Sequence, residues 1–388
     1  MQFNDSQQLT LVILPRITGF SSMIFSSLTI FNIIRSKRKT STMYHCLLLA
    51  MSFSNFFTSI AYAMGTWPIP RGSPYALRSQ AFGTQATCSA QGFFIQLGIA
   101  APFFNGMLSI YYLLTVRYGW KEKKIKKLQK YFFGIPIIFA LATAFASLGL
   151  SLYNNSIYWC WIAASPLLCD TTIKERDGSD CERGRNAWLF RWVFYFLPLF
   201  IIIFIATTSM ILIYIAVKKT EQKSKKWRIA SRSENEKKLK NSQRVLRQAF
   251  VFLLVFYFVY LPPLVAQLVT TVQGTLFFPL SVFQVIFVPA QGLLNYIVYI
   301  VRPKYLKYQK ENPEICVAKL IRMCCLCCML KPLNTVATTG TTICTAGTSE
   351  KKDDHHSDLN DHPEEETQLK IPNGDEDNDS TQSSTDEH

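Results

Sequence analysis

The side chains that could carry chemistry inside the long apolar stretches of this sequence are neutral amides. An amide can donate and accept hydrogen bonds between neighbouring helices, which contributes about 0.6 kcal/mol on average within a membrane. A helix would place Gln291 and Asn295 one turn apart on the same face. For each amide taken alone, packing between helices is the alternative to a functional role. The amides are Asn55, Gln96, Asn105, Gln267, Gln284, Gln291 and Asn295.

The same stretches lack the groups that acid–base or metal chemistry requires. They contain no Asp or Glu, and of the five histidines only His45 lies near one of them. Carboxylate and imidazole ligands are therefore too few to build a metal site there, and coupled transport of protons or sodium lacks its usual intramembrane carboxylate. The sequence predicts a protein that is not an enzyme and that has no metal site and no cofactor.

Four cysteines lie in segments predicted below to face outside: Cys88, Cys160, Cys169 and Cys181. An even number of cysteines in an oxidising compartment predicts disulfides, and four cysteines permit three pairings. We favour Cys88 with Cys160, which would tie the third apolar stretch to a long loop, and Cys169 with Cys181 as the second pair. The alternative is that one pair stays reduced.

A second group of cysteines follows the last apolar stretch in "MCCLCCML". Four sulfurs could in principle hold zinc, but zinc sites usually place their two Cys pairs far apart in sequence. We therefore predict S-acylation of a juxtamembrane segment. The acylated residues would be Cys324, Cys325, Cys327 and Cys328.

These residues must be positioned by membrane-spanning helices. The composition is 49% hydrophobic and 14% aromatic, which is typical of a membrane protein. A hydrocarbon layer about 30 Å thick needs roughly 20 helical residues, and seven stretches are long enough. We predict an all-α seven-transmembrane helix bundle over residues 10–301, with spans at 10–34, 43–65, 88–118, 131–152, 188–217, 244–271 and 279–301.

The distribution of Lys and Arg predicts the orientation of the bundle. Residues 35–39, 119–130, 218–247 and 302–331 hold 29 of the 41 basic residues, whereas the two longest opposite loops, 67–87 and 153–187, hold six. Because basic loops stay in the cytoplasm, the N-terminus is predicted outside and the C-terminus inside. The net charge of +15 is then explained by contact with anionic lipid, with no need for nucleic acid.

Residues 1–9 are predicted to form a short extracellular N-terminus without a folded domain, and the first span is expected to act as an uncleaved signal anchor. Two Asn-x-Ser sequons on the predicted outside, at Asn4 and Asn154, predict glycosylation.

Residues 302–330 are predicted to form an amphipathic segment, and residues 331–388 a disordered acidic tail. Residues 350–388 contain 14 of the 26 Asp and Glu residues. Hydroxyl residues beside these acids suit phosphorylation by a kinase and binding of an arrestin-like protein. The alternative is a tail that only adds solubility.

Seven spans, an outside N-terminus and a basic third inner loop together resemble a G protein-coupled receptor. Gln291-Gly292, Asn295 and Tyr299 are similar to the seventh-helix signature of the slime-mould cyclic-AMP receptors and of the secretin and adhesion families. "YWCWIA", at 158–163, resembles their Cys-Trp element, which supports the Cys88–Cys160 pair. The rhodopsin-like acid-Arg-Tyr triplet reads Val116-Arg117-Tyr118 here, so its acidic member is missing.

The resemblance implies a plasma-membrane receptor that binds a small extracellular ligand within the bundle and activates a heterotrimeric G protein. The sixth span would swing about Pro262 and uncover an inner cleft. The switch network would be Arg117, Tyr118, Pro262, Gln291, Asn295 and Tyr299. The candidate ligand contacts are Gln96, Arg191, Gln267 and Gln284.

Other classes of membrane protein predict other features. A retinal pigment would need a Lys in the seventh span, and an amine receptor would need a carboxylate in the third; both are missing. A multi-pass transporter or channel is the alternative, and it would predict flux without G protein dependence. A third possibility is a structural membrane protein without signalling.

Overall fold

A computed structural model describes residues 4–36, 41–73, 81–166, 169, 181–226, 232–273 and 277–301, with the backbone alone at 223–226, 232–245 and 272–273. Every one of these residues belongs to a compact unit that includes Met1–Pro303. The predicted juxtamembrane segment 302–330, with its acylated cysteines, and the predicted tail 331–388 lie outside the described residues.

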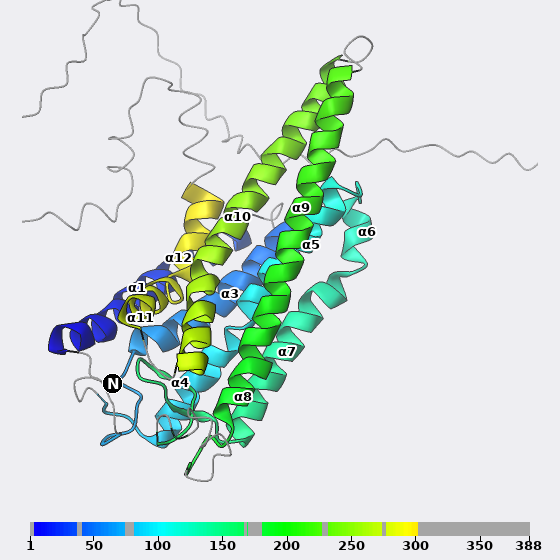
Figure 1. The fold of residues 1–388 in the computed structure, drawn as a ribbon. Coiled ribbons are helices and arrows are strands. Elements are labelled where there is room, and N and C mark those ends of the chain that lie inside the picture. Colours follow the sequence, from blue (N-terminus) through cyan, green and yellow to red (C-terminus); the bar gives the residue numbers. More distant parts are fainter. Residues whose placement is uncertain are drawn as a thin grey trace, which may run out of the picture. The chain divides into compact units, whose positions relative to one another are not determined.

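Long apolar helices make up this unit (Figure 1). Four spans are formed by single helices: α1 (Asp5–Ile34), α3 (Met43–Met64), α7 (Gln129–Gly149) and α10 (Arg232–Gln273). A fifth joins α8 (Ala187–Arg191), the π-helix η2 (Trp192–Phe196) and α9 (Leu197–Lys226). The remaining two are interrupted, as described below. By length and composition the described helices therefore give six spans, or seven when a bent pair counts as one.

The third span is interrupted between α4 (Gln85–Leu97) and α5 (Ala100–Val116). Pro102 has no N–H to donate to the carbonyl of Gly98, as the residue four positions along a regular helix would. The Gly98 carbonyl instead accepts from the backbone N–H of Ala101 at 3.0 Å, which tightens the turn. The hydropathy of the stretch carries no sign of this break, although its proline does.

The seventh span consists of α11 (Phe278–Phe287), α12 (Gln291–Tyr296) and the π-helix η3 (Ile297–Val301), and its two halves meet at 56°. Pro289 lies in the break and cannot donate to the carbonyl of Val285. The hydroxyl of Thr18, from α1, lies 3.3 Å from that carbonyl, and its shorter hydrogen bond, at 2.9 Å, is to the carbonyl of Leu14 in its own helix. A second helix thus adds a weak contact at the bend.

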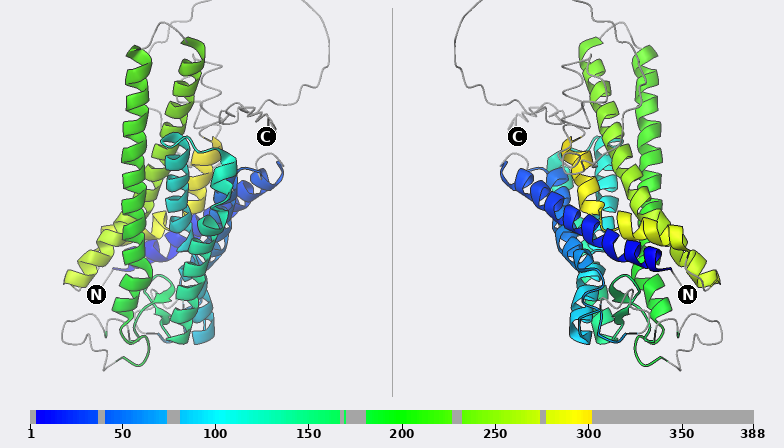
Figure 2. Two further views of the ribbon diagram at one scale, coloured as in Figure 1. Left: turned by 90° about the vertical axis from the view of Figure 1, so that its right-hand side faces the viewer. Right: turned by 90° about the vertical axis from the view of Figure 1, so that its left-hand side faces the viewer.

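Helix α1 packs closely against α3, α11 and α12, and Figure 2 shows it beside the yellow seventh span. The backbone N–H of Gly292 donates to the hydroxyl of Ser22 at 2.9 Å. A β-carbon at residue 292 would lie 2.1 Å from the hydroxyl oxygen of Ser26. Small residues therefore set the distance between these helices, as is common in membranes.

A short hairpin covers the outer end of the bundle, meaning the end that the charge pattern predicts to face outside. It pairs β1 (Tyr153–Asn155) with β2 (Cys160–Ile162) in antiparallel register, with Tyr153 opposite Ile162. The hairpin contacts α4. On the inner side the short helix α6 (Glu122–Lys126) follows the third span.

The seven predicted spans match the apolar parts of these helices, whose ends differ from the predicted ones by five residues or fewer. Helix α9 continues nine residues past the predicted end of its span, and α10 begins twelve residues before the predicted start of its span. The predicted glycosylation of Asn154 stays a prediction, and it falls on a side chain that is only 2% exposed. Its amide nitrogen donates to the carbonyls of Ser151 and Ala163, and its oxygen accepts from Arg183 at 3.1 Å. Asn4 is exposed at the N-cap of α1, and its glycosylation stays a prediction.

Candidate functional site

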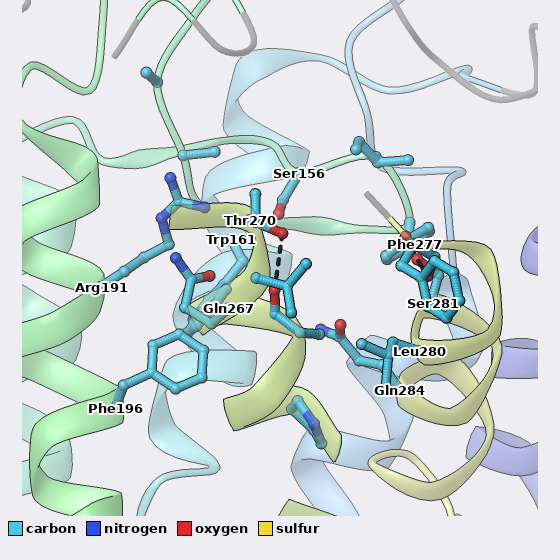
Figure 3. Close-up of a pocket in the computed structure, with 17 residues that line it drawn as sticks. Ser156, Trp161, Arg191, Phe196, Gln267, Thr270, Phe277, Leu280, Ser281 and Gln284 are labelled. Carbon is cyan, nitrogen blue, oxygen red and sulfur yellow. Dashed lines mark hydrogen bonds between the residues drawn. The ribbon is translucent and has the colours of Figure 1, made fainter. Parts of the chain in front are cut away.

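A pocket opens at the outer end between the hairpin loop, α8, η2, α10 and α11, and encloses about 840 Å³ including its mouth (Figure 3). Three of the four predicted ligand contacts line it, namely Arg191, Gln267 and Gln284. Figure 3 shows Arg191 and Gln267 on one wall and Gln284 near Leu280 and Ser281 on another. The structure thus brings together residues that are almost a hundred positions apart in sequence.

Gln96, the fourth predicted contact, does not line this pocket. Its side chain is fully buried, and its oxygen accepts from the indole N–H of Trp161 at 2.9 Å. Its nitrogen donates to Thr143 at 3.2 Å and to the carbonyl of Phe194 at 3.3 Å. These hydrogen bonds occupy the amide within the protein, so Gln96 positions Trp161, which does line the pocket.

The sequence explains why the backbone carbonyl of Phe194 can accept a hydrogen bond from Gln96. Residue 198, which would donate to it in a regular α-helix, is a proline. The helix widens to a π-turn over η2 just before this proline. Phe196, in the same π-turn, faces the pocket. The irregular backbone therefore shapes one wall of the site.

Tyr158 joins the hairpin loop to the seventh span. Its hydroxyl donates to the hydroxyl of Ser281 at 2.6 Å, and both residues line the pocket. Burial raises the pKa of the Tyr158 phenol to about 12. The phenol therefore stays neutral at physiological pH, and it adds a hydrogen-bonding group without a negative charge.

The part of the chain that the structure describes contains two disulfides, and they are the pairs that the sequence favoured. Cys88 is joined to Cys160, with the Cα atoms 5.2 Å apart, and Cys169 to Cys181, with the Cα atoms 5.7 Å apart. Gln91 reinforces the first pair from α4, because its oxygen accepts from the backbone N–H of Cys160 at 2.8 Å. The nitrogen of the same amide donates to two carbonyls at the end of α3, those of Ala61 and Gly65.

A hydrogen bond joins α10 to α12 below the pocket. The hydroxyl of Tyr260 donates to the side-chain oxygen of Gln291 at 2.6 Å, and both residues are buried. Nearer the inner end, Gln248 of α10 donates to the backbone carbonyl of Val298 at 3.2 Å. The sixth and seventh spans are therefore held together at two levels.

Buried amide donors surround the upper of these two contacts. Among the described residues, the side-chain nitrogens of Asn55, Gln291 and Asn295 have no hydrogen-bond partner. Asn55 and Gln291 line a small cavity of about 320 Å³ that includes its opening. A buried donor without a partner costs free energy.

The other residues of the predicted switch network fall into two places. Tyr299 belongs to an aromatic cluster with Tyr44 and His45 of α3, at centroid distances of 6.4 and 5.9 Å. Arg117 and Tyr118 lie apart from the buried contacts, since both are exposed and the guanidinium stands 5.7 Å from the Tyr118 ring centroid. The residues of the predicted network therefore do not form one cluster, since Gln291 and Asn295 are buried, Tyr299 is partly buried, and Arg117 and Tyr118 are exposed.

Pro262 lies within α10, which runs from Arg232 to Gln273 without a break. Figure 2 shows that this helix nevertheless changes direction along its course. Adjacent prolines at 262 and 263 remove two backbone hydrogen bonds, which permits such a bend. Pro263 also lines the outer pocket.

Glu122 occupies the inner end, and the sequence analysis did not single it out. Its carboxylate accepts from the backbone N–H of Met43, the first residue of α3, and from the hydroxyl of Tyr111 at 3.3 Å. Thr42, the N-cap of α3, makes no capping bond of its own and contacts His45 instead. Glu122 therefore supplies the missing cap from the inner loop.

We expect Glu122→Ala to lower the free energy of unfolding by about 1–2 kcal/mol, because a charged acceptor at a helix N-terminus is lost. Thermal unfolding of the purified protein in detergent measures this. Lys123→Ala is the matched control, since Lys123 is the exposed neighbour in the same helix. Equal effects of the two substitutions would contradict the capping role.

Sequence reasoning missed Gln91, Tyr260 and Glu122. Gln91 lies one turn beyond Cys88, so its position beside a predicted disulfide was a usable signal. Tyr260 carries one hydroxyl on a large apolar ring, and within an apolar stretch such a residue is expected to serve in packing. Glu122 is one acid within a basic loop, and only the fold brings it to α3.

Comparison with known proteins gives a consistent result. The chain matches the family model described as 7 transmembrane receptor (rhodopsin family) over residues 26–333. The crystal structure of squid rhodopsin is similar in fold, with a TM-score of 0.56, 15% sequence identity, and coverage of 84% of this chain and 89% of that one. No curated protein matches the sequence.

Neither similarity concerns the slime-mould cyclic-AMP receptors, so that closer resemblance stays a prediction. The family match spans the described helices from the last part of α1 onward, and it extends past the seventh span. It therefore covers well over half of the 388 residues, and the protein, a multi-pass membrane receptor and not an enzyme, belongs to the rhodopsin family of seven-transmembrane receptors.

Proposed function

We propose that this receptor binds a small extracellular ligand in the outer pocket and activates a heterotrimeric G protein at its inner face. The observation that carries the proposal is that α10 both lines the outer pocket and is hydrogen-bonded to the seventh span. One turn of this helix supplies Pro263, Ala266 and Gln267 to the pocket. The preceding turn supplies Tyr260, which is hydrogen-bonded to Gln291.

A ligand that contacts Gln267 acts on the helix that also holds the Tyr260–Gln291 contact, from the outer side of its two prolines. It shifts the equilibrium between helix arrangements by the difference between its affinities for them. Outward movement of the inner half of α10, bending at Pro262 and Pro263, would break the bonds to Gln291 and Val298. The bonds of α10 to the seventh span would then act as the restraint that ligand binding overcomes.

Space for this movement is supported by a third cavity, of about 260 Å³ with its opening, toward the inner end. It lies between α5, α9 and α10, and small residues such as Ala206, Ala249 and Ser109 line it. A helix of a G protein would insert between these spans once α10 has moved. Arg117, exposed at the end of α5, would contact that partner.

Further parts of this proposal concern the surroundings of the receptor. We place it in the plasma membrane with Asn4 glycosylated outside. The cysteines at 324–328 would be S-acylated, and a kinase and an arrestin-like protein would act on the acidic tail. These proposals are supported by sequence composition alone.

The proposal is tested by expression in cells that carry reporters for several G protein classes, screened against nucleotides, lipids and amino acids. We expect a response that is lost in Arg117→Ala and strongly reduced in Asn295→Ala, at unchanged surface expression. Solute or ion flux without any G protein response would favour the transporter or channel alternative. A full response in Asn295→Ala would remove the buried network from the mechanism.

A further inference from the structure

The carboxylate of Glu122 joins three elements at the inner end of the bundle. It lies in α6, five residues after Arg117 at the end of the third span. It accepts hydrogen bonds from the backbone N–H of Met43, the first residue of α3, and from the hydroxyl of Tyr111 at 3.3 Å. Tyr111 is buried in α5. One acid therefore ties the second and third spans to the loop that leads to the fourth.

The position of Glu122 strengthens these two hydrogen bonds. The side chain is partly buried, and α6 is anchored beside it by Ile125, which is fully buried. Hydrogen bonds to an ionised carboxylate are about twice as strong as those between neutral groups. Partial burial also removes some of the water that would compete for the carboxylate. The contact is therefore able to hold the two spans together.

Helix α3 carries a second residue that could cap its N-terminus. Thr42 occupies the N-cap position in the extended conformation that N-cap residues adopt, and threonine is a favoured residue there. It makes no capping bond, and its hydroxyl contacts the ring of His45 instead. Rotation of the Thr42 side chain to another staggered rotamer would bring the hydroxyl to the N–H groups of the first turn. Helix α3 can therefore lose Glu122 and still be capped.

This exchange of caps would be felt in the seventh span. The ring centroids of His45 and Tyr299 are 5.9 Å apart, and that of Tyr44 lies 6.4 Å from Tyr299 and 6.3 Å from Tyr111. These four residues form the inner aromatic cluster. When Thr42 turns away from His45 and the carboxylate leaves Tyr111, the cluster loses a polar contact on two sides. The cap of α3 is thus connected to a residue of the predicted switch network.

We propose that Glu122 is a releasable restraint on the inner end of the receptor. While its carboxylate holds Met43 and Tyr111, the second and third spans stay together at that end. A G protein bound at Arg117 pulls on the short loop that carries Glu122, and the hydroxyl of Thr42 then takes over as the cap of α3. This inference rests on the proposed function, because it names a restraint that the G protein releases. It acts separately from the bonds of α10.

Tyr111→Phe tests the restraint, because it removes one of the two hydrogen bonds and changes no charge. The thiol of Cys46 reports on opening at this place, since it lies in the first turn of α3 within electrostatic reach of Glu122 and Lys126 and is in no disulfide. We expect both the basal signal of a G protein reporter and the rate at which N-ethylmaleimide modifies Cys46 to rise roughly 3- to 10-fold. The rate is measured on the full-length receptor in membranes, by mass spectrometry of the peptide that carries Cys46.

Tyr131→Phe is the matched control. It removes the same hydroxyl from an exposed tyrosine near the start of α7, at the same end of the bundle. We expect both signals to change less than twofold. Equal rises for the two substitutions would overturn the proposal, as would no rise for Tyr111→Phe. Surface labelling of an N-terminal epitope verifies that each variant folds and reaches the cell surface.

Double variants test whether the two residues act through one carboxylate. Where Glu122→Ala has already removed the carboxylate, we expect Tyr111→Phe to change either signal less than twofold. Fully additive effects would contradict the shared restraint. Thr42→Val, added to Tyr111→Phe, should return both signals toward those of the unchanged receptor, because the alternative cap is lost. A further rise, or no change, would contradict the exchange of caps.

These outcomes are distinct from failure of the proposed function, because modification of Cys46 needs no G protein. Faster modification in Tyr111→Phe without a response from any reporter would leave the restraint standing and remove the G protein. A receptor that activates a reporter on ligand binding, while Tyr111→Phe changes neither signal, would do the reverse.

Discussion

Replacing Cys88 and Cys160 together by alanine is expected to have the largest effect on stability of any change at the outer end. The two cysteines are fully buried, and their disulfide closes a loop of 72 residues. Loss of a cross-link over this length costs up to about 4 kcal/mol by chain entropy, and less where the unfolded chain keeps its helices in the membrane. Surface expression and thermal unfolding in detergent measure the loss.

The second disulfide is the matched control for this change. Cys169 and Cys181 are only 12 residues apart, so their loss costs up to about 3 kcal/mol by the same reasoning. We also expect the two disulfides to differ in their effect on ligand response, because the first pair holds the strand that carries Trp161 over the pocket. Ligand response should fall in the first double variant more than stability alone explains. A larger loss from the second pair would contradict this.

Sequence predicts the spans well because the membrane imposes a simple length requirement. About 20 apolar residues in a row have few alternatives to a helix that crosses the bilayer. The interruptions near Gly98 and Pro289 are less visible, because hydropathy is unaffected by a lost backbone hydrogen bond. Their prolines do mark them, and the bend at Pro289 has a weak contact with Thr18, more than 260 residues away in sequence.

Sequence predicts which residues line the pocket where the type of side chain alone decides its place. It fails where a contact with a distant residue of the same chain decides that place. Arg191, Gln267 and Gln284 reach the pocket because they are polar residues near the outer ends of their spans. Gln96 has the same sequence signature, yet Trp161 from the hairpin occupies its amide. Asn154 likewise matches a glycosylation sequon, but the fold of its loop encloses it. Neither contact leaves a trace in the local sequence.

The second large effect that we expect is a rise in ligand-independent signalling in Tyr260→Phe. The substitution removes a 2.6 Å hydrogen bond between α10 and α12 and leaves the side-chain oxygen of Gln291 without its donor. A buried polar group without its partner costs about 1–3 kcal/mol, which corresponds to a shift of roughly 5- to 150-fold in a two-state equilibrium. The shift favours arrangements in which α10 has moved away, since there Gln291 can find other donors.

Two measurements separate this effect from a simple loss of stability. A G protein reporter follows basal activity, and the reactivity of a thiol at Ala249→Cys, buried in the inner half of α10, follows the opening of the inner cavity. Tyr257→Phe is the control, because the Tyr257 hydroxyl contacts Thr207 of α9 and not the seventh span. Its loss leaves the α10–α12 contact intact and should raise neither signal. If Tyr260→Phe reaches the surface normally and changes neither signal, the Tyr260–Gln291 bond is a packing contact, and the restraint on α10 has to lie in Gln248 and Val298.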